Sequence, residues 1–289
     1  MEHIAFLRRL SLVSFRDLMH PPITLEGFKA LRLKQPKRIC FGSSHKNALK
    51  RSDFGDWAGS LFVPFTETIG ELLPWRLFPN TGQHGGFRRG IKESEEFDQV
   101  QEWLRNHSDL VFIRSLFNTA VATCEHYTGN NSRSPIGELE NRAKYGGEVG
   151  ARDQISIILK GAFDRIHAGR HLSAVISVPP SVKGQLSLPN VLASRLAAAS
   201  GLPDLTSAMC WDGPKGQIKE LSVDQKWKAL ETVGMSVGDA VAGKDLLLID
   251  DMYQSGATAH FVASRLRVAG ANDLHLLAVS KGKRDTDNT

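Results

Sequence analysis

Residues 136–283 show a regular pattern in which short apolar runs alternate with amphipathic segments. The runs Ser173–Val178, Leu246–Ile249 and Leu274–Val279 are almost entirely apolar, which is typical of strands buried on both faces. Strands separated by helices indicate a mostly parallel sheet, because parallel neighbours need a crossover connection. Helices are expected at Arg152–His167, Leu188–Ser200 and Ser222–Thr232, with a further strand at Thr206–Trp211.

A similar alternation occupies residues 1–130. Strands are expected at Arg38–Gly42, Leu61–Phe65 and Leu110–Ile113, and helices at Ser94–Asn106 and Leu116–Tyr127. The stretch Tyr127–Pro135 is dense in turn-forming residues, so it is the best candidate for a domain boundary. The sequence therefore predicts a smaller α/β domain of unknown role over residues 1–130 and a second domain over residues 136–283.

The segment Leu246–Thr258 carries the strongest functional signal in the chain. Asp250 and Asp251 follow the apolar run, and the small-residue loop Gln254–Thr258 leads into an amphipathic helix. A helix N-terminus offers free N–H groups and a positive dipole to a phosphate. Two adjacent carboxylates can accept hydrogen bonds from a diol or orient a metal-bound water. The segment therefore predicts a site for a phosphorylated sugar at the carboxyl end of a strand.

The same segment resembles the phosphoribosyl-diphosphate (PRPP) motif of type I phosphoribosyltransferases. The resemblance implies that Asp250 and Asp251 hold the ribose diol and act in catalysis. It also implies that the loop wraps the 5′-phosphate, through Gln254, Ser255, Gly256, Ala257 and Thr258. Mg²⁺ is the implied cofactor, held by PRPP and reached by Asp250 or Asp251 through water. The implied reaction is transfer or cleavage at C1 of a 5-phosphoribosyl group.

Further landmarks are similar to the ComF branch of this family, the competence-associated, amidophosphoribosyltransferase-like proteins. They are Lys144–Gly147, Val175–Pro180, Gly201–Pro203, Gln217 and Ala269–Ala271. The resemblance implies a C-terminal type I phosphoribosyltransferase-like parallel sheet flanked by helices, preceded by the smaller α/β domain. It also assigns the pyrophosphate side to Ser181 and Lys183.

Several departures from this branch leave a second hypothesis open. The chain has no four-cysteine zinc ribbon, and the loop Ser181–Asn190 holds one cation, Lys183, where the branch is rich in arginine. Gln254 is bulkier than the residue usual at its position. The alternative is a catalytically weak PRPP-fold module for binding or regulation, linked to nucleic-acid handling, so whether the chain is an enzyme stays open. The acceptor is not identified.

Three other residues have two interpretations each. Lys215 and Lys219 either close over the pyrophosphate or belong to a solvated loop, which we favour. His260 either serves the phosphate or is a packing or surface histidine, which we favour.

Composition narrows the remaining classes. Of 289 residues, 41% are apolar and 23% charged, and no apolar run approaches the roughly 20 residues of a membrane span. We therefore expect a cytoplasmic protein with no membrane partner. The net charge of +5 is concentrated in residues 1–50, which hold ten Lys and Arg against three Asp and Glu. The expected partners are PRPP or another 5-phosphoribosyl compound, nucleic acid through residues 1–50, and a second copy of the chain.

Overall fold

The structure is a computed structural model that describes residues 19–282, except residues 53, 54, 83, 84, 168, 169, 183, 217 and 219. Three of the residues named above, Lys183, Gln217 and Lys219, lie outside the described residues, as do residues 1–18 of the basic segment. Within the described ranges, no helix combines the length and the apolar character that a membrane crossing needs.

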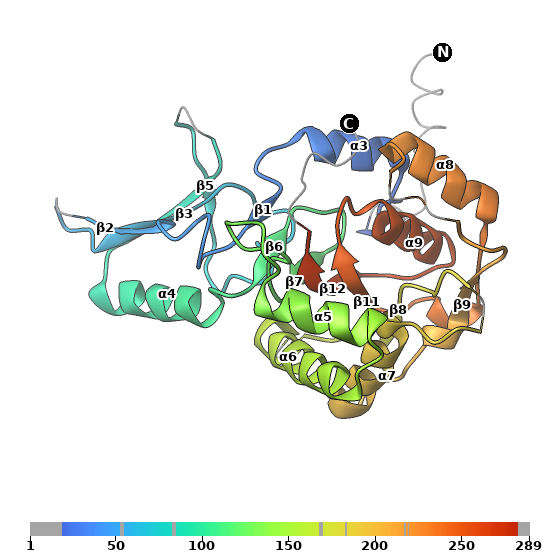
Figure 1. The fold of residues 1–289 in the computed structure, drawn as a ribbon. Helices are drawn as coiled ribbons and strands as arrows, with labels where there is room; N and C mark the ends of the chain where they lie inside the picture. The colour runs from blue at the N-terminus through green and yellow to red at the C-terminus, as the bar shows by residue number, and fades with distance from the viewer. Residues whose placement is uncertain are drawn as a thin grey trace, which may run out of the picture.

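A six-stranded sheet forms the centre of the molecule, in the order β1-β6-β7-β12-β11-β8 (Figure 1). Its last four strands run parallel to one another, and β1 and β6 extend it in antiparallel pairing. The sheet takes strands from both sides of the Tyr127–Pro135 stretch. The strands are β1 (Arg38–Ile39), β6 (Val111–Ile113), β7 (Thr119–Ala122), β8 (Ala174–Ser177), β11 (Leu246–Tyr253) and β12 (Leu274–Lys281).

Helices cover both faces of this sheet (Figure 1). Along β11, Leu246 and Leu248 belong to the core on one face, and Leu247 and Ile249 to the core on the other. Burial on both faces explains why the strand is apolar at every one of these positions. One face carries α5 (Pro135–Tyr145), α6 (Val149–His167) and α7 (Leu188–Ser200), and the other α3 (Leu25–Leu33), α8 (Val223–Val233) and α9 (Ala257–Val268).

A second, antiparallel sheet projects from the central one as an arm (Figure 1). Its strand order is β2-β3-β5-β4, and helix α4 packs against one of its faces through Phe97 and Val100. The arm comprises β2 (Leu49–Arg51), β3 (Gly59–Val63), β4 (Phe78–Pro79), β5 (Phe87–Ile91) and α4 (Ser94–Asn106). A two-stranded ribbon, β9 (Met209–Trp211) and β10 (Met235–Val237), lies near α8, with the short helices η1 (Thr206–Ala208) and η2 (Asp239–Val241).

The fold class is confirmed as α/β, with a mixed central sheet flanked by helices. The helix expected at Leu116–Tyr127 is wrong, because Thr119–Ala122 forms the strand β7 instead. All four residues are buried between β6 and β12, so pairing with two neighbours outweighs local helical preference. Helix α5 was not foreseen, and β11 continues past Ile249 to Tyr253. Both carboxylates of the motif therefore belong to a strand.

Leu276 tests the core of the central sheet, since its side chain in β12 is fully buried. Replacing it with alanine removes apolar contacts and leaves a cavity, so the free energy of unfolding should fall by about 2–5 kcal/mol. Leu33→Ala is the matched control, because Leu33 is 85% exposed in α3 and its truncation should change stability by less than about 0.5 kcal/mol. Urea denaturation measures both; equal losses would contradict the assigned core.

Candidate functional site

The parallel strands bring their carboxyl ends to one edge of the central sheet, and a cavity of about 1140 Å³ opens there. The segments that follow β7, β8, β11 and β12 all contribute to its wall, together with α5 and α8. Every motif residue from Asp250 to Thr258 lines it, as does Ser181. The fold thus brings together all the predicted site residues that the structure describes.

Asp250 and Asp251 lie in the last part of β11, and both side chains are largely shielded from solvent. Asp250 is buried, and the side chain of Asp251 is 13% exposed. Burial, together with the adjacent Asp251 carboxylate, raises the pKa of Asp250 to about 8, against the opposing effects of Lys144 and Lys215. At neutral pH the pair therefore carries less than two full negative charges.

Lys144, at the end of α5, forms an ion pair with Asp251, with Nζ 2.5 Å from Oδ2. Although burial lowers the pKa of Lys144, the Asp251 carboxylate outweighs it and the pKa is raised. The lysine is charged and occupies the position beside Asp251 Oδ2. A ligand that uses Asp251 must displace it or contact it.

The loop Gln254–Gly256 passes from β11 to α9 in a conformation that depends on glycine. Gly256 has φ +82°, and a Cβ there would lie 2.2 Å from the Tyr253 hydroxyl oxygen. Helix α9 begins at Ala257 after Gly256, which supplies no side-chain cap, and the Ala257 N–H donates to Ser255 Oγ at 3.4 Å. The start of the helix presents its backbone N–H groups at this point. Together with the Ser255 and Thr258 side chains at the cavity wall, these groups suit a phosphate.

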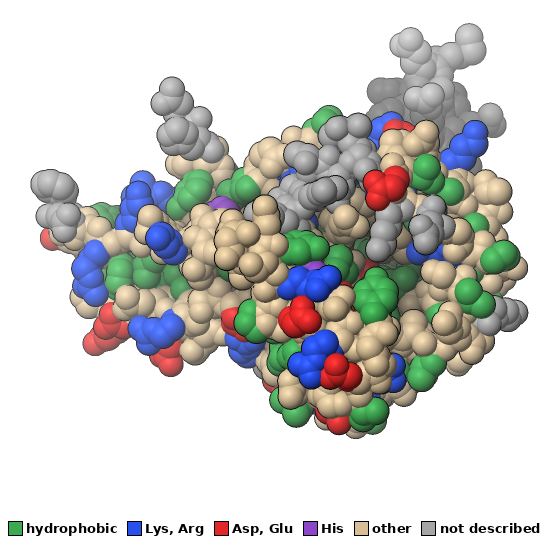
Figure 2. Space-filling model, viewed as in Figure 1, with side chains coloured by type: hydrophobic (Ala, Val, Ile, Leu, Met, Phe, Trp, Pro, Cys, Tyr) green, Lys and Arg blue, Asp and Glu red, His purple; other side chains and the backbone are tan. Residues whose placement is uncertain are grey.

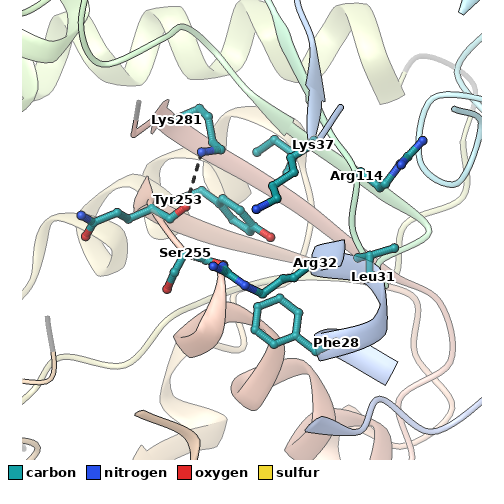
Figure 3. A pocket seen from close by; sticks show the side chains of 10 residues that line it. Phe28, Leu31, Arg32, Lys37, Arg114, Tyr253, Ser255 and Lys281 are labelled. Carbon is teal, nitrogen blue, oxygen red and sulfur yellow. Dashed lines mark hydrogen bonds between the residues drawn. The ribbon is translucent and has the colours of Figure 1, made fainter. Parts of the chain in front are cut away.

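Two cations brace this loop through its backbone carbonyl groups (Figure 3). Arg32 of α3 donates from Nη1 to the Ser255 carbonyl oxygen at 2.9 Å, and Lys281 of β12 donates from Nζ to that of Gln254 at 3.4 Å. Arg32 and Lys281 also line a second, very small hollow beside Tyr253 (Figure 3). With their carbonyl groups held there, Gln254 and Ser255 keep one orientation relative to the large cavity.

The loop expected on the pyrophosphate side is tied to a second loop that carries Lys215. The Lys215 amide donates to the Ser181 carbonyl oxygen at 3.1 Å, and Trp211 Nε1 donates to that of Pro179 at 3.2 Å. Burial lowers the pKa of Lys215, and the Asp250 and Asp251 carboxylates oppose this. Lys215 is therefore half-buried at the cavity, where the sequence favoured a solvated loop.

Reasoning from sequence assigned no role to two lysines of the cavity. Lys144 had a signal, since it begins the landmark Lys144–Gly147. Lys226 had none, because it lies inside the capped helix α8, where it is 4% exposed and lines the cavity. With Lys215 they place three lysines at the cavity, of which Lys144 and Lys215 act on the pKa of Asp250.

A buried polar network reaches the cavity wall through His126 and Glu140, and it was also not foreseen. His126 Nδ1 lies 3.0 Å from Ser280 Oγ and 3.3 Å from Glu140 Oε2, and the Ser280 hydroxyl donates to Glu140 Oε2 at 2.5 Å. All three side chains are at most 5% exposed. Glu140 lies four residues before Lys144, so α5 contacts both the network and Asp251.

His260 packs inside the fold, as the sequence favoured. It is fully buried, stacks on Phe28 with ring centroids 4.1 Å apart, and its Nε2 lies 3.1 Å from Ser115 Oγ. Burial lowers its pKa to about 4, so it is neutral at physiological pH.

The donor set is compatible with Mg²⁺ only when a ligand supplies further oxygens. Among the described residues, no cluster of three or more His, Cys, Asp or Glu could hold a metal by itself. Mg²⁺ commonly uses one or two carboxylates, several waters and the phosphates of its substrate. Asp250 and Asp251 supply the two carboxylates.

No family model and no curated protein matches this chain. Solved structures that resemble it include a glutamine PRPP amidotransferase from B. subtilis, complexed with ADP and GMP (17% identity, TM-score 0.36, 68% of this chain and 38% of that one). Another is orotate phosphoribosyltransferase from Mycobacterium tuberculosis H37Rv in complex with PRPP (13% identity, TM-score 0.29, 56% of this chain and 97% of that one). A third is an allosteric regulatory enzyme of purine biosynthesis (15% identity, TM-score 0.36, 90% of this chain and 58% of that one). The chain thus spans less than two thirds of the first and third, and similarity at this level carries no argument about function.

The raised pKa of Asp250 predicts how stability depends on pH. Between its ordinary value of 3.8 and about 8, the folded chain binds a proton that the unfolded chain does not. The stability from this group is therefore present below about pH 4 and is lost as the pH rises through 8. Asp250→Asn should make the free energy of unfolding fall less steeply from pH 5 to pH 8.

Urea denaturation across this range measures the slope. Asp56→Asn, at an exposed aspartate, is the control and should leave the slope of the wild type unchanged. Parallel curves for wild type and Asp250→Asn would contradict the assigned cause.

Proposed function

We propose that this protein binds PRPP, or another 5-phosphoribosyl compound, in the large cavity and acts at C1 of the ribose with Mg²⁺. The observation that carries the proposal is that a pair of carboxylates and a helix N-terminus line the same cavity. The carboxylate pair of β11 and the N-terminus of α9, which the loop Gln254–Gly256 joins, both line the cavity. A phosphorylated sugar matches both at once, with its diol at the acids and its phosphate at the helix.

Each part of the ligand then has a partner in the cavity. The 5′-phosphate accepts hydrogen bonds from the backbone N–H groups of residues 255–258 and from the Ser255 and Thr258 hydroxyls. Asp250 and Asp251 accept hydrogen bonds from the 2′- and 3′-hydroxyls. The diphosphate faces Ser181 and Lys215.

Departure of diphosphate from C1 leaves positive charge on the ribose ring, so positioning and charge neutralisation dominate the chemistry. Mg²⁺, bound by the diphosphate and reached by Asp250 or Asp251 through water, would neutralise the leaving group. Lys215 adds a cation on the same side. Lys144 moves from Asp251 as the diol arrives, which frees that carboxylate and gives the diphosphate another cation.

We place the acceptor at the end of the cavity lined by His126 and Glu140. An N–H or O–H nucleophile that attacks C1 must lose a proton, and an imidazole held by a carboxylate is suited to take it. The nearby Tyr127, Asn131 and Arg133 also line this end and would contact the acceptor.

A second candidate function is binding without efficient turnover, as in a sensor or regulatory module. The Lys144–Asp251 ion pair favours it, because the ligand must break a contact already made in the diol position. Measuring release of pyrophosphate from bound PRPP, with and without candidate acceptors, distinguishes the two functions. Tight binding with no release would favour the module.

Asp251→Asn tests the diol role. Removing one charged acceptor should weaken PRPP roughly ten- to 150-fold, the value of a hydrogen bond to a charged group. Isothermal calorimetry with Mg²⁺ measures the affinity, and Asp164→Asn on the exposed face of α6 is the control. Asp251→Asn both removes the acceptor and releases Lys144 from its ion pair. Lys144→Met removes the lysine alone, so comparing the two variants separates these effects. Unchanged affinity in Asp251→Asn would exclude the diol role.

Lys215→Gln tests the diphosphate role. The variant should weaken PRPP roughly tenfold while leaving the affinity for ribose 5-phosphate unchanged, because only PRPP carries the diphosphate. Lys228→Gln, at an exposed lysine of α8, is the matched control. Equal losses for the two ligands would place Lys215 near the sugar or the 5′-phosphate instead.

A further inference from the structure

The arm presents one sheet face that no described helix covers. Helix α4 lies against the other face, where Leu61, Val63 and Ile91 are fully buried. Because side chains alternate along a strand, the neighbours of these residues point outward. Two cross-strand rows form the outward face. The first is Lys50, Ser60 and Gly90, and the second is Phe62, Arg88 and Phe78.

Trp57 lies over the first row as a flat aromatic surface. A Cβ at Gly90 would approach the Trp57 ring to 2.6 Å, so glycine is needed for the indole to rest on the sheet. The indole stays 46% exposed, and Lys92 Nζ lies 5.3 Å from its ring centroid. Phe78, 54% exposed, is a second aromatic side chain on the same face, with Arg76 over its ring.

Lys50 and Arg88 give the outward face positive charge. The four strands of the arm contain no Asp or Glu. No described carboxylate lies within ion-pair distance of Lys50 or Arg88. Both residues, with Trp57, line a hollow of about 600 Å³. Figure 2 shows Lys, Arg and hydrophobic side chains together over β2, β3 and β5, while most acidic side chains of the arm lie over α4.

We propose that this face of the arm binds single-stranded nucleic acid, with a base stacked on Trp57 and backbone phosphates held by Lys50 and Arg88. Exposed aromatic rings interleaved with cations are the chemistry by which proteins hold unpaired bases and their phosphates. A duplex hides its base faces, so it would meet the cations but leave the indole unused. Strands about 4.8 Å apart make the four-stranded face about 15 Å wide, enough for a few nucleotides. The inference does not depend on the function proposed for the cavity.

The test is fluorescence anisotropy with a labelled 12-nucleotide oligothymidylate and the full chain, in a salt series from 50 to 300 mM. Trp57→Ala should weaken binding roughly five- to 150-fold through the lost stacking, and Trp57→Phe should retain most of the affinity. Lys50→Gln/Arg88→Gln should lower the salt slope by about 1.4, since each cation releases about 0.7 counterion from a single strand. The matched control is Lys228→Gln/Arg265→Gln, which removes the same charges from exposed positions on α8 and α9. It should bind as wild type does.

Two results would overturn the proposal. One is the absence of saturable binding at 50 mM salt, or binding that neither Trp57→Ala nor the Lys50/Arg88 variant weakens. The other is that duplex DNA competes with the oligothymidylate as well as single-stranded DNA does, while Trp57→Ala leaves the affinity unchanged. The face would then bind polyanions in general. Thermal melting of each variant shows whether it folds. If Trp57→Ala fails to fold, the double variant of Lys50 and Arg88, which changes only the sheet surface, still tests the proposal.

Discussion

The parallel pairing of β11 with β8 on one side and β12 on the other is the constraint on which the candidate site depends. In a parallel sheet, neighbouring strands finish at the same edge, and the segments that follow them must share the space there. That edge receives the carboxylates of β11 and the loop Gln254–Gly256 after it, the Ser181 loop after β8, Ser280 of β12 and His126 after β7. Burial of β11 on both faces fixes its register, so Asp250 and Asp251 have one position relative to these neighbours.

Electrostatic balance is the second feature of the site. Burial disfavours the charged form of Asp250, and repulsion by the adjacent Asp251 carboxylate adds to this, which is why the pKa of Asp250 is raised. Lys144 approaches from α5 and Lys215 from the loop after β9, so the charges that stabilise the acids belong to segments outside the motif. The same lysines suit a ligand with several phosphate charges. Lys144 already pairs with Asp251, so an anionic ligand in the cavity would compete with this carboxylate for the lysine.

Helix α5 and the arm extend this arrangement in different directions. Through Glu140 and Lys144, α5 connects the polar network around His126 with the carboxylate of Asp251. A movement of α5 would therefore change both ends of the cavity together. The arm contributes Phe97, Val100 and Ile91 to the core shared with the central sheet, while its outward face remains open to solvent. The arm is thus fixed to the molecule by one face and presents the other.

The sequence by itself determined β8, β11 and β12, the helices α6, α7, α8 and α9, and the position of the small-residue loop after β11, because these depend on local patterns. Apolar runs identified β8, β11 and β12, and the order of acids, small residues and helix marked the loop. Tertiary structure alone decided what surrounds them. Lys226 looks like any helical lysine until α8 packs beside the loop, and His126, Glu140 and Ser280 are distant in sequence. Residues 119–122 form a strand only because β6 and β12 offer pairing on both sides, a long-range energy that no local pattern contains.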